Sequence, residues 1–170
     1  IAKLESQQIA TFKRLDAAAD EALSDPTREK SLIDESGKTE GSHIAAFFKQ
    51  AIPSPDVDVV AKSLSANQLP AILSLSEEER RMRDYMTKVL AQEAHIKPKA
   101  TLVLNTNNSL VTAIYRARDK DPALAKEMAQ GLFELTQLAS HELKAEEMGH
   151  FIERWNSLTL ALAEKIGKEI

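Results

Sequence analysis

Two places in the sequence put a histidine near a glutamate at a spacing that could serve metal chemistry. His141-Glu142 begins like the His-Glu-x-x-His motif of zinc proteases, which needs a second His one helical turn further on. Position 145 is Ala, so we reject this chemistry. Glu147 and His150 form a single Glu-x-x-His pair, whereas a ferritin-like di-metal site needs two such pairs and two further Glu. We therefore interpret Glu147 and His150 as solvated side chains on a helix near a loop, and the lack of a second Glu-x-x-His pair disfavours a helical metal-binding enzyme.

Two polar runs are better explained by helix and turn chemistry than by binding sites. Glu77–Glu79, followed by Arg80, Arg81 and Arg83, puts acidic side chains in the first turn of a predicted helix, where the helix dipole favours them. Exposed Glu–Arg pairs contribute only ~0.3–0.5 kcal/mol each, so a solvated helix face is predicted. Asn105–Asn108 is typical of a turn. No Ser, His and Asp residues show a spacing that supports nucleophilic catalysis.

One apolar stripe follows the charge run and has two interpretations. Its residues recur at helical spacing i, i+3, i+4, i+7 and i+8: Met82, Tyr85, Met86, Val89 and Leu90. Such a stripe usually packs into a core. The alternative is an exposed surface for partner proteins, which the two flexible, polarisable methionines favour slightly.

Composition narrows the class of protein. The chain has 170 residues, 43% hydrophobic and 28% charged, with a net charge of -4, which argues against a nucleic-acid binder. It has no cysteine, which excludes disulfides and thiolate chemistry. No apolar run approaches the roughly 20 residues of a membrane span, and no signal peptide is visible. This composition predicts a soluble, cytoplasmic, helix-rich chain. Because the first residue is Ile1 rather than Met, we expect it to be a fragment of a longer protein.

The first half of the chain predicts a linker and a small sheet. The polar, Pro- and Gly-containing stretch 24–42 is the linker candidate. The remaining predictions are a short strand at 9–15, a weak helix at 16–23, an amphipathic helix at 43–52 stopped by Pro53, and strands at 57–61, 69–75 and 101–104. The stretch 63–68 is predicted to be a turn or a hairpin connection. Ser76 with Glu79 forms a capping-box pattern that predicts a helix over 77–92.

The second half predicts helices. Ser109 is predicted to cap a helix over 110–118, and Asp121-Pro122 to begin a long one. A last helix over 144–169, after a short connection around His141, completes an antiparallel hairpin. The broad apolar stripes of these two helices need a further partner, and a second copy of the hairpin would supply it as a four-helix bundle. Their stripe residues are Leu124, Met128, Leu132, Leu135, Leu138, Met148, Phe151, Ile152, Trp155, Leu158, Thr159, Leu162 and Ile166.

Four collinear segments together carry a family pattern: FKRLD at 12–16, LPAIL at 69–73 with EERRM at 78–82, LVLNTNNSLV at 102–111, and FIERWNSL at 151–158. They resemble, in this order, the "RVD" segment, the "PA-I…E-RRM" stretch, the "LVLN-NNPLV" segment and the "F-ERSN-LL" helix of the heat-shock protein 90 chaperones, specifically the bacterial HtpG type. Ser109 and Trp155 depart from that pattern. The chain also lacks the acidic "MEEVD" tail, so docking of tetratricopeptide co-chaperones is not expected.

The resemblance implies a domain layout and a function. Residues 1–23 would be the tail of the middle domain, 24–42 a linker, and 43–170 the C-terminal dimerisation domain. The fragment would form a homodimer, bind no nucleic acid, membrane or cofactor, and perform no catalysis. ATP and Mg²⁺ would act in the N-terminal domain of the parent chaperone. The implied surfaces are a client-binding helix with Met82, Tyr85, Met86, Val89 and Leu90, and a dimer interface with Leu135, Leu138, Met148, Ile152, Trp155, Leu158 and Leu162.

These predictions define one fold class and two functions. The fold is α+β: a small three-stranded sheet with packed helices, ending in a helical hairpin that forms a four-helix bundle across a dimer. The function is dimerisation of a chaperone that also offers an amphipathic helix to partly folded clients. The alternative is an oligomerisation or adaptor module without client binding, in which the 82–90 stripe is buried.

Overall fold

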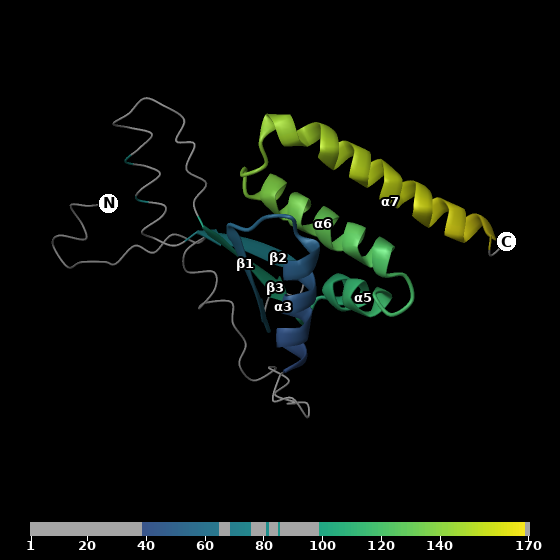
Figure 1. Ribbon diagram of the computed structural model, residues 1–170, viewed down its shortest axis with the longest axis horizontal. Helices are drawn as coiled ribbons and strands as arrows, with labels where there is room; N and C mark the ends of the chain where they lie inside the picture. The colour runs from purple at the N-terminus through teal and green to yellow at the C-terminus, as the bar shows by residue number, and fades with distance from the viewer. Residues whose placement is uncertain (1–38, 65–68, 76–80, 82–84, 86–98, 169–170) are drawn as a thin grey trace.

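A computed structural model describes residues 39–64, 69–75, 81, 85 and 99–168 of the chain. These residues form an α+β fold of three strands and several helices (Figure 1). In chain order the elements are α3 (Glu40–Ala51), β1 (Val57–Lys62), β2 (Ala71–Leu75), β3 (Ala100–Asn105), α5 (Ser109–Ala117), α6 (Pro122–Ala139), the 3₁₀ turn η2 (Ala145–Glu147) and α7 (Met148–Lys168). The predicted elements at 9–23 lie outside the described residues, and the helix predicted over 77–92 is described only at Arg81 and Tyr85, which are both helical.

The sheet is mixed, with strand order β1-β3-β2. β1 runs parallel to β3 and β2 runs antiparallel to it. The prediction of a small three-stranded sheet is confirmed, but a hairpin joining β1 to β2 is wrong, because β3 lies between them. The central strand of a sheet covered by helices is its most buried strand. β3 has the composition for this position, since Leu102, Val103 and Leu104 are all almost completely buried.

The main core lies between one face of the sheet and three helices (Figure 1). Val59 and Leu73 lie opposite Leu102 in register, so the three side chains form one row on that face. Helices α3, α5 and α6 cover this face with the side chains Ile44, Phe48, Val111, Ile114, Leu132 and Phe133. Gln130 on α6 also donates from Nε2 to the carbonyl of Ala51 at 2.7 Å, which satisfies a free acceptor at the end of α3.

The helix starts follow capping chemistry, which shifts two of the predicted boundaries. Helix α3 begins three residues before the predicted start, because the Thr39 hydroxyl accepts from the amide of Ser42 at 3.2 Å. Helix α5 begins at Ser109, because Asn108 rather than Ser109 provides the cap. Helix α6 starts as predicted, with Asp121 accepting from Leu124 N at 3.1 Å and Pro in the first turn.

Asn105 joins three parts of the chain at the end of β3, although the sequence predicted it in a turn. Its side chain is fully buried. Its Oδ1 accepts from Leu64 N at 3.2 Å and from Asn107 N at 3.1 Å, and its Nδ2 donates to Leu69 O at 2.9 Å. Asn107 in turn donates to the hydroxyl of Ser63 at 2.8 Å. This network holds the ends of β1 and β3 and the start of β2 together.

The connection from α6 to α7 is a tight reversal at His141. Its φ of 58° lies in the left-handed region, where Gly is the usual residue. The His141 amide donates to Leu138 O at 3.1 Å and the Glu142 amide to Gln137 O at 2.8 Å, which is the Schellman pattern of a helix end. Helix α7 then starts at Met148, after the turn η2, rather than at the predicted Lys144. The predicted antiparallel hairpin is confirmed, since α7 lies alongside α6 (Figure 1).

Within the described residues, no helix is long and apolar enough to cross a membrane.

Candidate protein interaction surface

Helix α7 has two apolar faces, and only one of them packs on the rest of the chain. The inner face lies along α6 and contains the partly buried side chains of Phe151, Arg154 and Leu158. The outer face carries Ile152, Trp155, Leu162 and Ile166, which are 50%, 48%, 61% and 54% exposed. We call these four residues the outer stripe. A contiguous exposed apolar patch of this kind is typical of an interaction surface.

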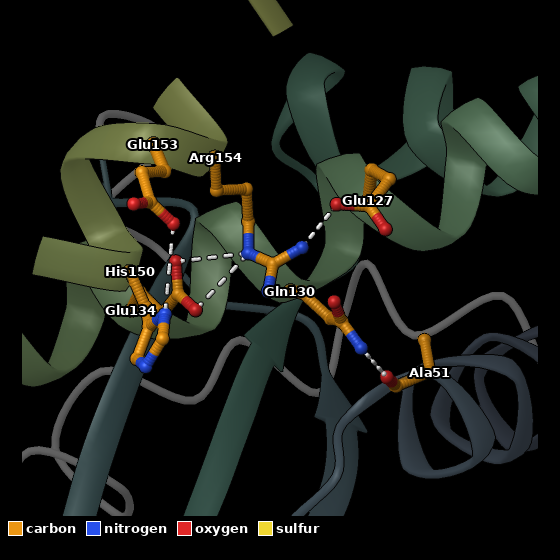
Figure 2. Close-up of polar contacts among 7 residues, drawn as sticks. All are labelled: Ala51, Glu127, Gln130, Glu134, His150, Glu153 and Arg154. Carbon is orange, nitrogen blue, oxygen red and sulfur yellow. Dashed lines mark hydrogen bonds and ion pairs between the residues drawn. The ribbon is translucent and has the colours of Figure 1, made fainter. Parts of the chain in front are cut away.

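An ion-paired arginine fixes the inner face to α6 (Figure 2). Arg154 Nε lies 3.1 Å from both carboxylate oxygens of Glu134, and its Nη1 donates to Glu127. Burial lowers the pKa of Arg154, but the hydrogen bonds and charges of Glu134 and Glu127 raise it more, so its pKa lies above the ordinary value. Because Arg154 is only 20% exposed and Glu134 only 18%, this is a better positioned pair than an open surface ion pair.

A glycine in the middle of α6 allows α7 to approach closely. A Cβ atom added at Gly131 would lie 3.1 Å from Leu158 Cδ1 and 3.8 Å from Arg154 Cδ. Gly131 lies between Glu127 and Glu134 along α6, so the close contact and the ion pairs belong to the same patch. Gly is unfavourable inside a helix by about 1 kcal/mol relative to Ala, and the closeness of Leu158 gives the physical reason for its presence.

The two ends of α7 carry weaker polar contacts. Near its C-terminal end, Lys165 Nζ lies 3.7 Å from Asp121, the capping residue of α6. Near its N-terminal end, His150 lies 3.7 Å from Glu153 on the same helix, with both side chains largely exposed (Figure 2). Exposed pairs at this distance contribute little energy. The position of α7 therefore depends mainly on the patch around Gly131 and Arg154.

The outer stripe is continuous with the inner face through an aromatic stack. The rings of Phe151 and Trp155 are stacked with centroids 6.5 Å apart and an interplanar angle of 23°. Thr159 lies within the outer stripe and its hydroxyl donates to Trp155 O at 2.8 Å. No charged residue occupies a stripe position between Ile152 and Ile166. The surface is therefore apolar and leaves no hydroxyl donor that needs water.

The structure places the predicted dimer residues in two groups. Ile152, Trp155, Leu162 and Leu138 are exposed, whereas Leu135, Met148 and Leu158 are partly buried within the chain. Of the predicted client-binding residues, Tyr85 is helical and 60% exposed. The other four, Met82, Met86, Val89 and Leu90, lie outside the described residues.

The sequence reading missed the contribution of Arg154 and Gly131 to the inner face. A signal was present: Glu127 and Glu134 are seven residues apart on α6, so they share a helix face with Gly131 between them. The partly buried Arg154 meets these two carboxylates only because two helices pair. The periodicity of a single helix does not predict which helix it pairs with.

Metal ligands do not gather in the part of the chain that the structure describes, where no group of three His, Asp or Glu side chains is positioned to hold an ion. In the same residues every buried side-chain nitrogen or oxygen has a hydrogen-bond partner. The outer stripe is therefore the feature with the clearest functional potential.

Comparison with known proteins gives no assignment: no protein-family model matches the chain, and no curated protein sequence matches it.

Proposed function

We propose that this chain is a C-terminal dimerisation fragment of a chaperone similar to the heat-shock protein 90 family, and that it forms a homodimer through α6 and α7. The observation that carries the proposal is the outer stripe: α7 packs on α6 with one face and leaves four large apolar side chains exposed on the other. The four collinear segments that resemble the family support the same function independently of this surface.

Dimerisation would act by keeping two arms of the parent protein close together. A constitutive link between two chains raises the effective concentration of one arm for the other to the millimolar range for short flexible connections, roughly as for tethered binding modules. Closure of distal domains then becomes an intramolecular step. The fragment contributes this link and no chemistry of its own.

The energy available from the outer stripe is moderate. Full burial of a large apolar side chain contributes about 1.5–3 kcal/mol, so burying the exposed half of each stripe residue contributes about 1 kcal/mol. Eight such side chains in a dimer give roughly 8 kcal/mol, against an association cost of about 4–15 kcal/mol. A stable dimer therefore needs apolar contacts from α6 as well. Leu138, an exposed side chain on α6, is a candidate for such a contact.

Light scattering over a dilution series tests the proposal. The expected result is a mass of twice 18.8 kDa for the wild-type chain and of a monomer for Ile152→Glu/Trp155→Glu, because two charges in each chain would have to be buried in the interface without a partner of opposite charge. Leu160→Glu is the matched control: Leu160 is 61% exposed but lies off the stripe, so this variant should stay dimeric. A wild-type monomer at every concentration, or a dimer that persists in the double variant, would contradict the proposed interface.

Client binding is the second part of the proposed function, and the exposure of Tyr85 supports it. The matching experiment measures suppression of client aggregation by the parent protein that contains this chain. Met82→Ser/Met86→Ser should weaken the suppression while the dimer persists. Unchanged suppression would instead favour the adaptor function, in which the chain oligomerises without handling clients.

A further inference from the structure

The outer stripe is almost symmetric about its central residue, Thr159. Ile152 and Ile166 lie seven residues before and after Thr159, while Trp155 lies four before and Leu162 three after. At 1.5 Å per residue, the two isoleucines are each about 10.5 Å from Thr159 along the helix axis. If a two-fold axis lies level with Thr159 and perpendicular to the helix, the stripe of one helix therefore lies against the stripe of an antiparallel copy along its whole length.

We infer that α7 pairs with α7 of a second copy in an antiparallel register centred on Thr159. This inference rests on the proposed dimer and adds its geometry. A two-fold interface uses the same patch on both chains, so each residue meets a partner of complementary position. Here Ile152 of one protomer lies opposite Ile166 of the other, and Trp155 lies within one residue, about 1.5 Å along the axis, of Leu162.

The polar groups around the axis are suited to this register. Thr159 is exposed, yet its hydroxyl already donates to Trp155 O at 2.8 Å, so burial at the axis leaves no unsatisfied donor. The flank of the stripe that faces away from α6 carries Asn156 and Ala163, both exposed and uncharged. In the antiparallel register Asn156 of one helix lies opposite the small Ala163 of its partner. No like charges meet along the stripe, which a self-pairing surface requires.

The area of the stripe indicates how far the interface extends. From Ile152 to Ile166 the stripe is about 21 Å long and a helix is about 10 Å wide, which gives roughly 200 Å² in projection. A standard interface buries about 800 Å² per partner. The α7 pair therefore accounts for only part of a standard interface, and the exposed Leu138 on α6, in the row of Gly131 and Glu134, is the candidate for a further contact.

Cysteine cross-linking tests the register directly, because the chain has no cysteine of its own. Single substitutions Thr159→Cys, Ile152→Cys and Ile166→Cys are treated with a short bismaleimide and the products are separated by mass. Thr159→Cys should shift from the 18.8 kDa monomer to twice that mass. Ile152→Cys alone should not shift, since its two copies are about 21 Å apart along the axis. A mixture of Ile152→Cys and Ile166→Cys should cross-link.

The controls separate failure of the register from failure of the dimer. Glu164→Cys, on the side of α7 away from the stripe, gives the background from random collisions. If light scattering shows a wild-type dimer but Thr159→Cys stays at background, the register is wrong while the dimer stands. Self-cross-linking of Ile152→Cys would indicate a parallel pair and would also overturn the inference. A wild-type monomer removes the dimer and the register together.

Discussion

Replacing Gly131 with Ala tests whether α7 lies against the middle of α6. The substitution removes an unfavourable glycine from a helix, which by itself stabilises the fold by about 1 kcal/mol. The new Cβ would lie 3.1 Å from Leu158 Cδ1, which is closer than ordinary contact, so Leu158 must move. Overpacking of this kind costs about 1–3 kcal/mol, at the low end here because the atom is the tip of a flexible side chain.

The expected effect of Gly131→Ala therefore depends on Leu158. In the wild-type chain the two effects nearly cancel, so the free energy of unfolding should change by about 0 to -1 kcal/mol. In a Leu158→Ala background the crowding is gone, and the same substitution should stabilise by about 1 kcal/mol. The coupling between the two positions is then about 1–2 kcal/mol, within the range that contacting residues show.

Urea unfolding followed by circular dichroism of the four proteins measures this cycle. The wild-type chain, both single variants and the double variant give four free energies of unfolding, from which the coupling follows. Equal stabilisation by Gly131→Ala in both backgrounds would refute the packing of Leu158 on Gly131. The ion pairs of Arg154 with Glu127 and Glu134 are left in place in all four proteins.

Two further predictions concern the ends of secondary-structure elements, and the same unfolding assay measures both. His141→Gly should raise the free energy of unfolding by about 0.5–1 kcal/mol, because it relieves a left-handed φ of 58°. His141→Val should lower it by about 1 kcal/mol, and opposite signs would show that His141 has favourable contacts that outweigh its backbone strain. Asn105→Ala should lower it by about 2–3 kcal/mol, since it leaves the amides of Leu64 and Asn107 and the carbonyl of Leu69 without their partner. The exposed Asn156→Ala is its control, and an equally small effect at both positions would contradict the role of Asn105.

Local patterns predicted most helices and strands because the relevant signals are local. Pro53 and Pro122 mark a helix end and a helix start in the structure as in the sequence. The apolar runs at 57–62, 71–75 and 100–105 are strands. Each of these depends on side-chain spacing and on backbone chemistry within a few residues.

Sheet order and the burial of Asn105 could not be predicted, because both depend on contacts between distant segments. The central position of β3 follows from pairing with β1 and β2, which come more than twenty residues earlier in the chain. Two of the hydrogen bonds of the Asn105 side chain join residues 36 and 41 positions away. A run of four polar residues is typical of a turn, and only the neighbouring segments make its first member part of the core.

The division of α7 into two faces was only partly visible in the sequence. The stripe with Ile152, Trp155 and Leu162 was identified together with Phe151 and Leu158 as one broad surface. The structure separates them, since Phe151 and Leu158 lie toward α6 and the others are exposed. The decisive residue is Arg154, whose two glutamate partners on α6 place it on the inner face.

The arrangement of Arg154 between two glutamates also has a mechanical consequence. Glu127 and Glu134 lie two helical turns apart, about 10.5 Å along the axis of α6, and Arg154 contacts both. A force that slides α7 along α6 in either direction therefore pulls Arg154 away from one carboxylate, while Leu158 is driven across the Gly131 contact. Such a load acts on all these contacts in shear, at the same time, instead of peeling them one after another. We therefore expect the α6–α7 pair to resist displacement along its length more than separation sideways.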